Sequence, residues 1–245
     1  MTATGSEGAG GRVGGPEKPG EINHETPVSG EALDLPLDRL EPYLADRLTE
    51  MRPPFRWTRF RGGQSNPTYL VEDSHGARRV LRRKPYGTLL PSAHAIEREY
   101  RVMAALAGTG VPVPAMAHLC EDPDVIGAAF YVMAYVEGEG HTHLALPART
   151  PAFRRAVAET LVDTLAAIHG VDVAAAGLAA FGRPGGYLMR QTARWSAQYR
   201  ASETAAIPAM ERLIEALPAA LGAVPDETCL VHGDYRLDNL RFAAG

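Results

Sequence analysis

The order of the hydrophobic patterns constrains the fold most, because strand patterns come first along the chain and helix patterns follow them. Alternating apolar and polar residues, or continuous apolar runs, predict strands at residues 55–60, 68–72, 79–84, 115–120 and 129–136. Apolar residues at a period of 3.6 then predict a long helix from Phe153 to His169. Strands segregated from helices in this way are typical of an α+β fold.

Shorter helices are expected where apolar residues recur at helical spacing, at residues 36–50, 93–106 and 209–220. Residues 1–30 differ from the rest, because they are rich in Gly, Glu, Pro and Ser and have almost no large apolar side chains. Such a segment buries too little surface to offset the entropy lost on ordering, so we expect a disordered tail.

The composition is that of a globular protein, with 245 residues, 45% hydrophobic and 22% charged. A net charge of −4 argues against nucleic acid or an anionic membrane as the main partner. No apolar run reaches the length of about 18 residues that spans a bilayer, and no apolar signal segment opens the sequence. Cys120 and Cys229 both stand beside apolar residues, so we expect buried thiols in a reducing, cytoplasmic environment.

The most specific motif is His232-x-Asp234-x-x-x-x-Asn239, which follows a short apolar strand predicted at residues 229–231. Phosphoryl transfer needs a carboxylate that takes or orients the proton of the attacking hydroxyl, and an oxygen ligand for Mg²⁺ beside the phosphates. Asp234 and Asn239 offer these groups at the spacing found in the catalytic loop of protein kinases. The alternative is an ordinary loop, in which Asp234 caps a turn and Asn239 bonds a backbone carbonyl.

The run His-Gly-Asp-Tyr-Arg-Leu-Asp-Asn-Leu at residues 232–240 resembles the signature loop of the aminoglycoside phosphotransferase superfamily, the small-molecule branch of the protein-kinase-like fold. Residues 81–85 with 89–101, and residues 187–195, resemble the subgroup of phosphotransferase domains associated with acyl-CoA dehydrogenases. The resemblance implies an α+β fold of two lobes, a small antiparallel-sheet N-lobe with one helix and an incomplete helical C-lobe. Beyond the tail at residues 1–30, we expect a nucleotide-binding N-lobe at 31–136 and a partial C-lobe at 137–245 that contains the catalytic loop at 230–240. The resemblance implies that His232 braces this loop.

The glycine-containing loop between the first two strands could approach an anion closely, because glycine lacks Cβ and tolerates positive φ. Its residues are Gly62, Gly63, Gln64, Ser65 and Asn66, and the last two add side-chain donors. In the superfamily, Gly-Gly-x-Ser-Asn at this place resembles the loop that covers the phosphates. A plain hairpin turn is the alternative.

The resemblance to kinase-like folds implies a fixed cation on the third strand that holds the α- and β-phosphates of the nucleotide. Arg82 is our candidate, with Lys84 as the second choice. The alternative is that these are surface charges at a strand end. Glu99 falls on the apolar stripe of the following helix, so it needs a partner that Arg82 can supply, whereas Glu97 is expected to point aside.

The superfamily resemblance further implies that the backbones of Ala134 and Val136 meet the adenine edge, with Met133 packed nearby. It implies ATP and Mg²⁺ as cofactors, with Asn239 as one metal ligand. A second metal-binding aspartate would follow this loop, and no residue up to Gly245 can fill that role. We therefore expect a C-terminally truncated chain with weak nucleotide binding and very low turnover.

The acceptor is expected to be a small molecule with a hydroxyl group. The aromatic and cationic face of residues 187–199 could line its pocket, or could cover apolar surface instead. Because this segment carries no acidic residue, it disfavours aminoglycosides, and the subgroup resemblance favours a hydroxylated metabolite such as a hydroxyacyl thioester. Two other functions stay open: a non-catalytic kinase-like domain that binds a nucleotide or a partner, and a metal hydrolase using His232 and Asp234.

Overall fold

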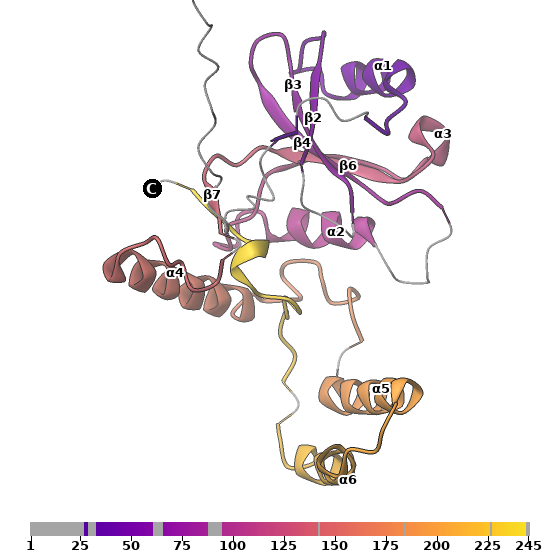
Figure 1. The fold of residues 1–245 in the computed structure, drawn as a ribbon. Coiled ribbons are helices and arrows are strands. Elements are labelled where there is room, and N and C mark those ends of the chain that lie inside the picture. Colours follow the sequence, from indigo (N-terminus) through magenta and orange to yellow (C-terminus); the bar gives the residue numbers. More distant parts are fainter. Residues whose placement is uncertain are drawn as a thin grey trace, which may run out of the picture.

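The computed structural model describes residues 27–28, 33–60, 66–87, 95–141, 143–183, 185–225 and 227–243. Its main element is an antiparallel sheet with the strand order β1-β2-β3-β4-β6-β5 (Figure 1). The strands are β1 Pro27–Val28, β2 Arg56–Phe60, β3 Thr68–Glu72, β4 Arg78–Arg83, β5 Met116–Cys120 and β6 Phe130–Ala134. This arrangement confirms the predicted α+β class, since the sheet lies in the first half of the chain and helices dominate the second.

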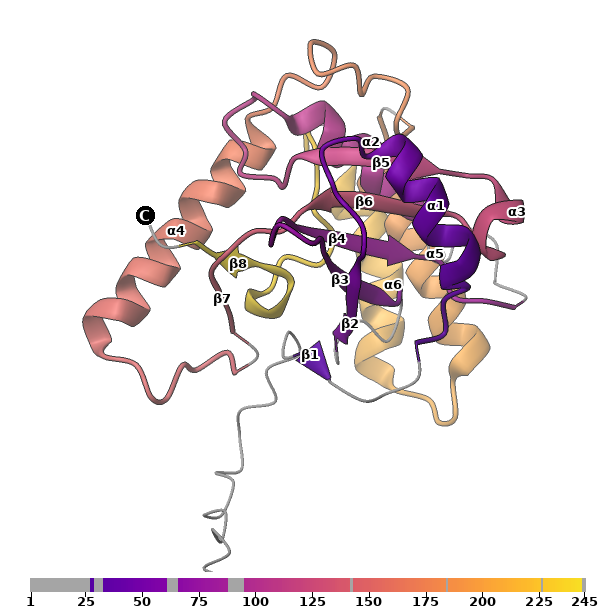
Figure 2. The ribbon, with the colours of Figure 1, turned by 90° about the horizontal axis from the view of Figure 1, so that it is seen from above.

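Helices cover both faces of the sheet (Figures 1 and 2). On one face, α1 (Leu37–Arg47) packs beside the short helix α3 (Pro123–Ile126) over the main hydrophobic core. On the other face, α2 (Ile96–Leu106) packs against β5 and β6. The α1 face is apolar at every second strand residue, as the period of a pleated strand requires, and its buried members include Tyr69, Val71, Leu81, Phe130 and Val132. Thus α1 and α3 add to the one helix implied for this lobe.

The second half of the chain is mainly helical. It contains α4 (Pro151–His169), α5 (Tyr187–Ser202), α6 (Pro208–Leu221) and a 3-10 turn, η1 (Leu237–Asn239). Thr150 fixes the start of α4, because its side-chain oxygen accepts a hydrogen bond from the Phe153 N–H at 3.2 Å. A two-stranded ladder pairs β7 (Glu139–Gly140) with β8 (Arg241–Phe242), so the segment after the main sheet meets the segment after η1.

Two expectations about residues 229–231 are wrong. No strand forms there, and Cys229 is exposed, whereas Cys120 is buried as expected. The segment has no neighbouring strand to pair with in the described chain, so its apolar character does not produce a strand. Among the described residues, no helix combines the length and the apolar character needed to cross a bilayer.

Arg83, for which the sequence suggested no role, is a buried charged group. Its side chain is only 1% exposed, pairs with Asp34 and donates to the hydroxyl of Tyr69 at 3.3 Å. Burial, followed by the hydrogen bond to Asp34, raises the pKa of Tyr69 to about 12, so its hydroxyl remains a donor to Asp34. This network ties the segment before α1 to the face of β4 that lies opposite to Arg82.

Candidate active site

Strand register gathers one row of polar side chains on the α2 face of the sheet. Thr68 on β3 lies opposite Arg82 on β4, which in turn lies opposite Tyr131 on β6. Residues directly opposite each other in antiparallel strands project to the same face. The row therefore faces α2, which presents Glu99 to it.

The Glu99 carboxylate accepts three hydrogen bonds from this region. Arg82 Nε donates to Oε2 at 2.9 Å and the hydroxyl of Tyr131 donates to the same oxygen at 3.0 Å. The amide of Asn66 donates to Oε1 at 3.0 Å. The predicted ion pair between Arg82 and Glu99 is thus present, and two further donors fix the carboxylate from either side.

Sequence reasoning missed Tyr131, because its pairing opposite Arg82 is known only from the strand register of the structure. Burial, and then the negative charge of Glu99, raise the pKa of Tyr131 well above its usual range. Its hydroxyl is therefore protonated at any physiological pH and acts as a permanent donor to Glu99. The aromatic ring is 2% exposed, so this donor has a fixed position.

Arg82 has its own orientation fixed as well. Its Nη1 donates to the Thr68 hydroxyl at 3.2 Å, in addition to the bond from Nε to Glu99. Its remaining amino group, Nη2, has no hydrogen-bond partner among the described residues. The Arg82 side chain as a whole is 27% exposed, so it is not sealed from solvent.

Lys84, the second choice for the cation, is committed to a different partner. Its ammonium group pairs with Glu97, which therefore does not point aside as the sequence suggested. Lys84 lies just beyond β4, where alternation returns its side chain to the Arg82 side of the strand. Two parallel ion pairs thus join this end of β4 to the first turn of α2.

Of the predicted phosphate-covering loop, only Asn66 can be placed, since Gly62, Gly63, Gln64 and Ser65 lie outside the described residues. Asn66 is 2% exposed and donates to Glu99. Its side chain therefore supports the Arg82–Glu99 pair, and a direct contact with phosphate stays a prediction.

The loop at residues 232–239 is closed by hydrogen bonds between its predicted catalytic groups. Gly233 has a φ of 84°, a conformation that allows the turn after His232. His232 Nδ1 accepts a hydrogen bond from the Asp234 N–H at 3.4 Å. The Asn239 amide donates to Asp234 twice, to Oδ2 at 2.8 Å and to the carbonyl oxygen at 2.9 Å. Asp234 and Asn239 are therefore brought together.

Two residues of the loop that the sequence did not single out hold it against α4. The Tyr235 hydroxyl donates to the Leu161 carbonyl at 2.7 Å. Leu237 is 7% exposed and packs in a cluster with Leu146 and Val157. Figure 1 shows η1 on the same side of the sheet as α2, the side that carries the Arg82 row, with α1 and α3 on the other side.

The donor set of this loop suits Mg²⁺. The carboxylate of Asp234 and the amide oxygen of Asn239 are the hard oxygen ligands that Mg²⁺ prefers, and both residues are exposed. Within the described chain, no group of three or more His, Cys, Asp and Glu side chains could hold a metal by itself. Mg²⁺ commonly keeps several waters and is shared between one or two protein ligands and phosphates.

The predicted adenine contacts lie at the end of β6. Ala134 is its last residue, and its N–H already donates to the Ala115 carbonyl at 2.8 Å. Met133 and Val136 are half-buried. No contact tests their roles, which stay predictions.

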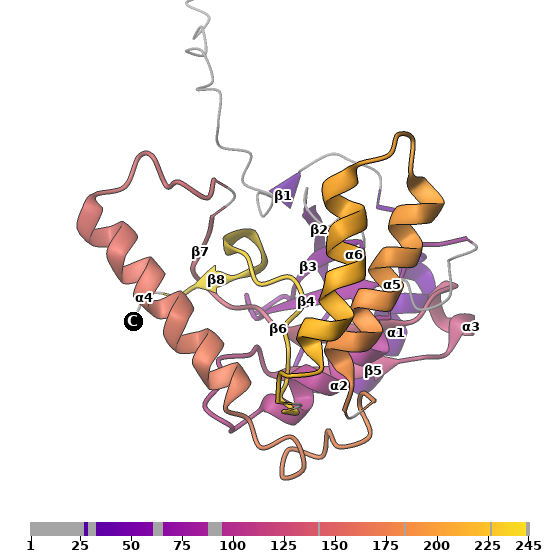
Figure 3. The same cartoon turned by 90° about the horizontal axis from the view of Figure 1, so that it is seen from below.

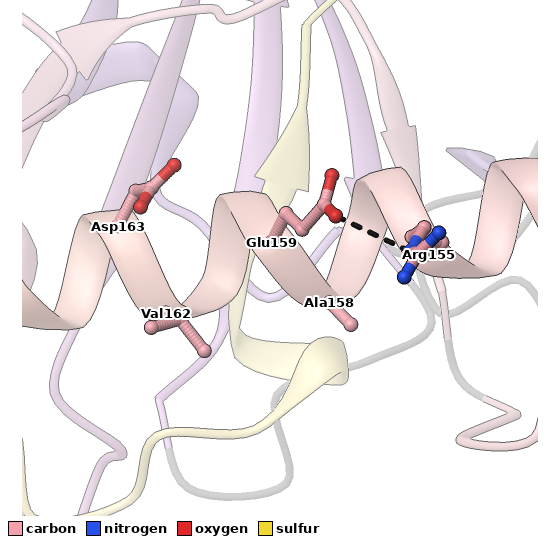
Figure 4. A pocket seen from close by; sticks show the side chains of 5 residues that line it. All are labelled: Arg155, Ala158, Glu159, Val162 and Asp163. Atoms are coloured by element: carbon pink, nitrogen blue, oxygen red, sulfur yellow. Dashed lines mark ion pairs between the residues drawn. The ribbon is translucent and has the colours of Figure 1, made fainter.

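The α5 segment has the predicted helical form and forms an antiparallel pair with α6 (Figure 3). None of its residues is buried, and Tyr187 and Trp195 are largely exposed. Two surface hollows were found elsewhere. One of about 480 Å³ lies along α4, where Arg155 pairs with Glu159 at 3.4 Å (Figure 4). The other, of about 390 Å³, lies between the C-terminal ends of α2 and α4. No predicted site residue lines either.

Comparison with known proteins gives a consistent result. The sequence profile of the phosphotransferase enzyme family matches residues 56–245. A solved structure from Ralstonia eutropha, named as a candidate aminoglycoside phosphotransferase, is 44% identical with a TM-score of 0.74, over 85% of this chain and 61% of that one. A macrolide 2'-phosphotransferase structure from Brachybacterium faecium is 21% identical with a TM-score of 0.58, over 83% of this chain and 68% of that one, and it shares the fold.

Curated relatives confirm the subgroup resemblance. Acyl-CoA dehydrogenase family member 10 of Mus musculus is 49% identical over 213 residues, which are 86% of this chain and 20% of the relative. Acyl-CoA dehydrogenase family member 11 of Rattus norvegicus is 42% identical over 207 residues, 83% of this chain and 26% of the relative. The chain thus spans about a fifth to a quarter of the length of these relatives.

Proposed function

This chain belongs to the phosphotransferase enzyme family, and we propose that it is an ATP- and Mg²⁺-dependent enzyme that transfers the γ-phosphoryl group of ATP to a hydroxyl of a small molecule. Three hydrogen-bond donors around the Glu99 carboxylate carry the proposal. Glu99, held by Tyr131 and Asn66, orients Arg82, whose side chain is 27% exposed. Such a preorganised cation stabilises phosphate charge without reorganising during the reaction.

The loop at residues 232–239 supplies the groups proposed to take part in phosphoryl transfer. Asp234 accepts the proton of the acceptor hydroxyl, or orients that hydroxyl for attack. The hydroxyl oxygen of the acceptor forms the new bond to the γ-phosphorus, and the bond from this phosphorus to ADP breaks. Asn239 is held against Asp234 and offers its amide oxygen to Mg²⁺. When bound, Mg²⁺ neutralises charge on the phosphate oxygens. His232 braces the backbone of Asp234. Positioning and charge stabilisation, rather than covalent chemistry, account for the rate.

Binding and transfer measurements separate the two parts of the site. Calorimetric titration of Mg-ATP is compared between the wild type, Arg82→Gln and Asp234→Asn, together with ADP release in the presence of a panel of hydroxyl compounds. Arg82→Gln is expected to weaken Mg-ATP binding about tenfold, because a charged hydrogen-bond partner of the phosphates is lost. Asp234→Asn is expected to retain binding and to lose transfer by a factor of about a hundred or more.

Two control substitutions match these changes. Arg56 carries an exposed ion pair to Glu72 at 3.2 Å on the same sheet, so Arg56→Gln removes the same charge away from the site. Asp46 lies 3.5 Å from Arg47 on α1, with a side chain 77% exposed, so Asp46→Asn is the matched acid change. If Arg82→Gln behaves like Arg56→Gln, or Asp234→Asn like Asp46→Asn, the proposed roles are wrong.

A non-catalytic nucleotide-binding domain is the second candidate. The Arg82–Glu99 pair is compatible with it, because an oriented cation can hold phosphate charge whether or not transfer follows. In that case ATP would raise the unfolding midpoint equally with Mg²⁺ and with EDTA, and no hydroxyl compound would be phosphorylated. Phosphorylation of any compound in the panel excludes it.

The acceptor class follows from the family subgroup and from α5. A hydroxylated metabolite, such as a hydroxyacyl thioester, suits a segment that carries arginines and no acidic residue between Tyr187 and Tyr199. Free thiols at Cys120 and Cys229 support a reducing, cytoplasmic location for the reaction.

A further inference from the structure

One aromatic side chain, Tyr135, connects the two halves of the candidate site. It directly follows the last residue of β6 and separates Ala134 from Val136, the residues expected to meet the adenine. Continuing the β4–β6 register by one residue places Arg78 opposite Tyr135. The Arg78 guanidinium accordingly lies 4.6 Å from the centre of the Tyr135 ring. Arg78 also pairs with Glu137, so the residues on both sides of Val136 are tied to β4.

The other contact of Tyr135 comes from the end of the catalytic loop. Arg241 Nη2 donates to the Tyr135 hydroxyl at 3.0 Å, and its guanidinium carbon lies 5.1 Å from the ring centre. Arg241 is the first residue of β8 and stands two positions after Asn239. Tyr135 therefore lies between one arginine of the sheet and one arginine that follows the predicted metal ligand.

Backbone pairing makes the same connection independently. β7 and β8 pair with Gly140 opposite Arg241 and Glu139 opposite Phe242 (Figure 2). Gly138 has a φ of 151°, and a Cβ at this position would lie 2.2 Å from the Phe242 carbonyl oxygen. Only glycine allows β8 to approach this closely. The segment after β6 is thus held to the segment after η1 at two successive points.

From these contacts we infer that Tyr135 and Arg241 form a positioning pair, which sets the distance between the adenine-binding backbone at Ala134–Val136 and the metal-binding loop at Asp234–Asn239. The inference rests on the proposed function. ATP joins a base to a triphosphate through a linker of fixed reach, so its affinity depends on that distance, whereas a ligand carrying only one of the two parts does not sense it.

Fragments of the nucleotide therefore provide the test. Calorimetric titrations compare Mg-ATP, adenosine and Mg-tripolyphosphate on the wild type and on Tyr135→Phe, which keeps the ring between the arginines and removes the hydroxyl. Mg-ATP binding is expected to weaken about threefold to tenfold, the range for one lost hydrogen bond. Adenosine and Mg-tripolyphosphate are each expected to change less than about twofold, because each contacts only one half.

Tyr43→Phe is the matched control. The Tyr43 hydroxyl also makes one side-chain hydrogen bond, to His118 Nε2 at 2.9 Å, but on α1 and away from the candidate site. This control should leave the binding of all three ligands unchanged. Arg241→Lys, which keeps the charge and one donor, should restore most of the Mg-ATP affinity that Arg241→Gln loses.

Two results overturn the inference. Unchanged Mg-ATP binding by Tyr135→Phe would show that the pair does not set the distance. Equal weakening of all three ligands, with a lowered unfolding midpoint, would show that the hydroxyl only stabilises the fold. A wild type that fails to bind Mg-ATP would instead refute the proposed function, and the inference with it.

Discussion

Glu99→Gln is the substitution whose effects the structure specifies most closely. The carboxylate receives donors on both oxygens, Arg82 and Tyr131 on Oε2 and Asn66 on Oε1. A glutamine amide has a single accepting oxygen, so the donor or donors on one of the two former carboxylate oxygens would face an NH₂ group instead. The best orientation keeps the oxygen toward Arg82 and Tyr131, and it sets two NH₂ groups against each other at the Asn66 side.

The magnitude follows from burial. A hydrogen bond to a charged group contributes about 1.5–3 kcal/mol to stability when it is sheltered. Here the Arg82 and Glu99 side chains are 27% and 35% exposed, so solvent screens part of the interaction. We expect a loss of about 1–2 kcal/mol in the free energy of unfolding. Because a neutral amide oxygen holds the Arg82 guanidinium less firmly than a carboxylate does, Mg-ATP affinity should fall about tenfold.

Glu97→Gln is the comparison that makes this test sharp. It makes the same chemical change two residues earlier on α2 and breaks the ion pair between Glu97 and Lys84. The side chains of this pair are similarly exposed, Glu97 at 19% and Lys84 at 28%. Urea denaturation and Mg-ATP titration of both variants are the measurements. Glu97→Gln should cost about 1 kcal/mol or less and leave nucleotide affinity unchanged. Equal losses of affinity in both variants would refute the assignment of Arg82 as the phosphate-binding cation.

Three further predictions concern other parts of the fold. Burial alone would raise the pKa of Asp34, but the hydrogen bond from Tyr69 and the charge of Arg83 together outweigh it and lower that pKa. The stabilising effect of Asp34 is therefore full above its unfolded pKa of about 4 and is lost as the pH falls through the lower folded value. Asp34→Asn should destabilise the fold by about 1–3 kcal/mol at pH 7 in urea melts, with the difference vanishing in acid, and a pH-independent difference would contradict this. Gly138→Ala should weaken the β7–β8 ladder by about 2 kcal/mol or more and reduce Mg-ATP affinity, because the alanine Cβ would collide with the Phe242 carbonyl oxygen. A melting curve equal to that of the wild type would show that the backbone there can shift. Burial lowers the pKa of His118, so the folded state favours its neutral form and the stability should decline as the pH falls below about 6.5. His118→Gln should flatten this decline in thermal melts from pH 7 to 5. An unchanged slope would show that another group causes the decline.

The sequence predicted those parts of the site that depend on periodicity. Glu99 was chosen over Glu97 because it falls on the apolar stripe of its helix, and the structure pairs it with Arg82. Helical period also located α4 and α5 to within a few residues. Such patterns reflect which face of an element is buried, and that is encoded locally in the residues.

Features that depend on strand register and on distant contacts could not be predicted in this way. Tyr131 reads as one more apolar residue of a buried run, and only its pairing opposite Arg82 shows that it is a donor to Glu99. Arg83 resembled its neighbours on a charged strand end, yet Asp34 and Tyr69 bury it. The strand expected at residues 229–231 failed because an apolar run becomes a strand only where a neighbouring strand can pair with it.

The central claim is that Arg82 and Asn239 serve one bound triphosphate, Arg82 through its charge and Asn239 through Mg²⁺. The most direct measurement is the affinity for ATP of the wild type, Arg82→Gln and Asn239→Ala, each with Mg²⁺ and with EDTA. We predict that Arg82→Gln weakens ATP binding under both conditions, whereas Asn239→Ala weakens it only when Mg²⁺ is present. An Asn239→Ala affinity equal to that of the wild type in Mg²⁺, or an Arg82→Gln affinity unchanged in both conditions, would contradict the claim.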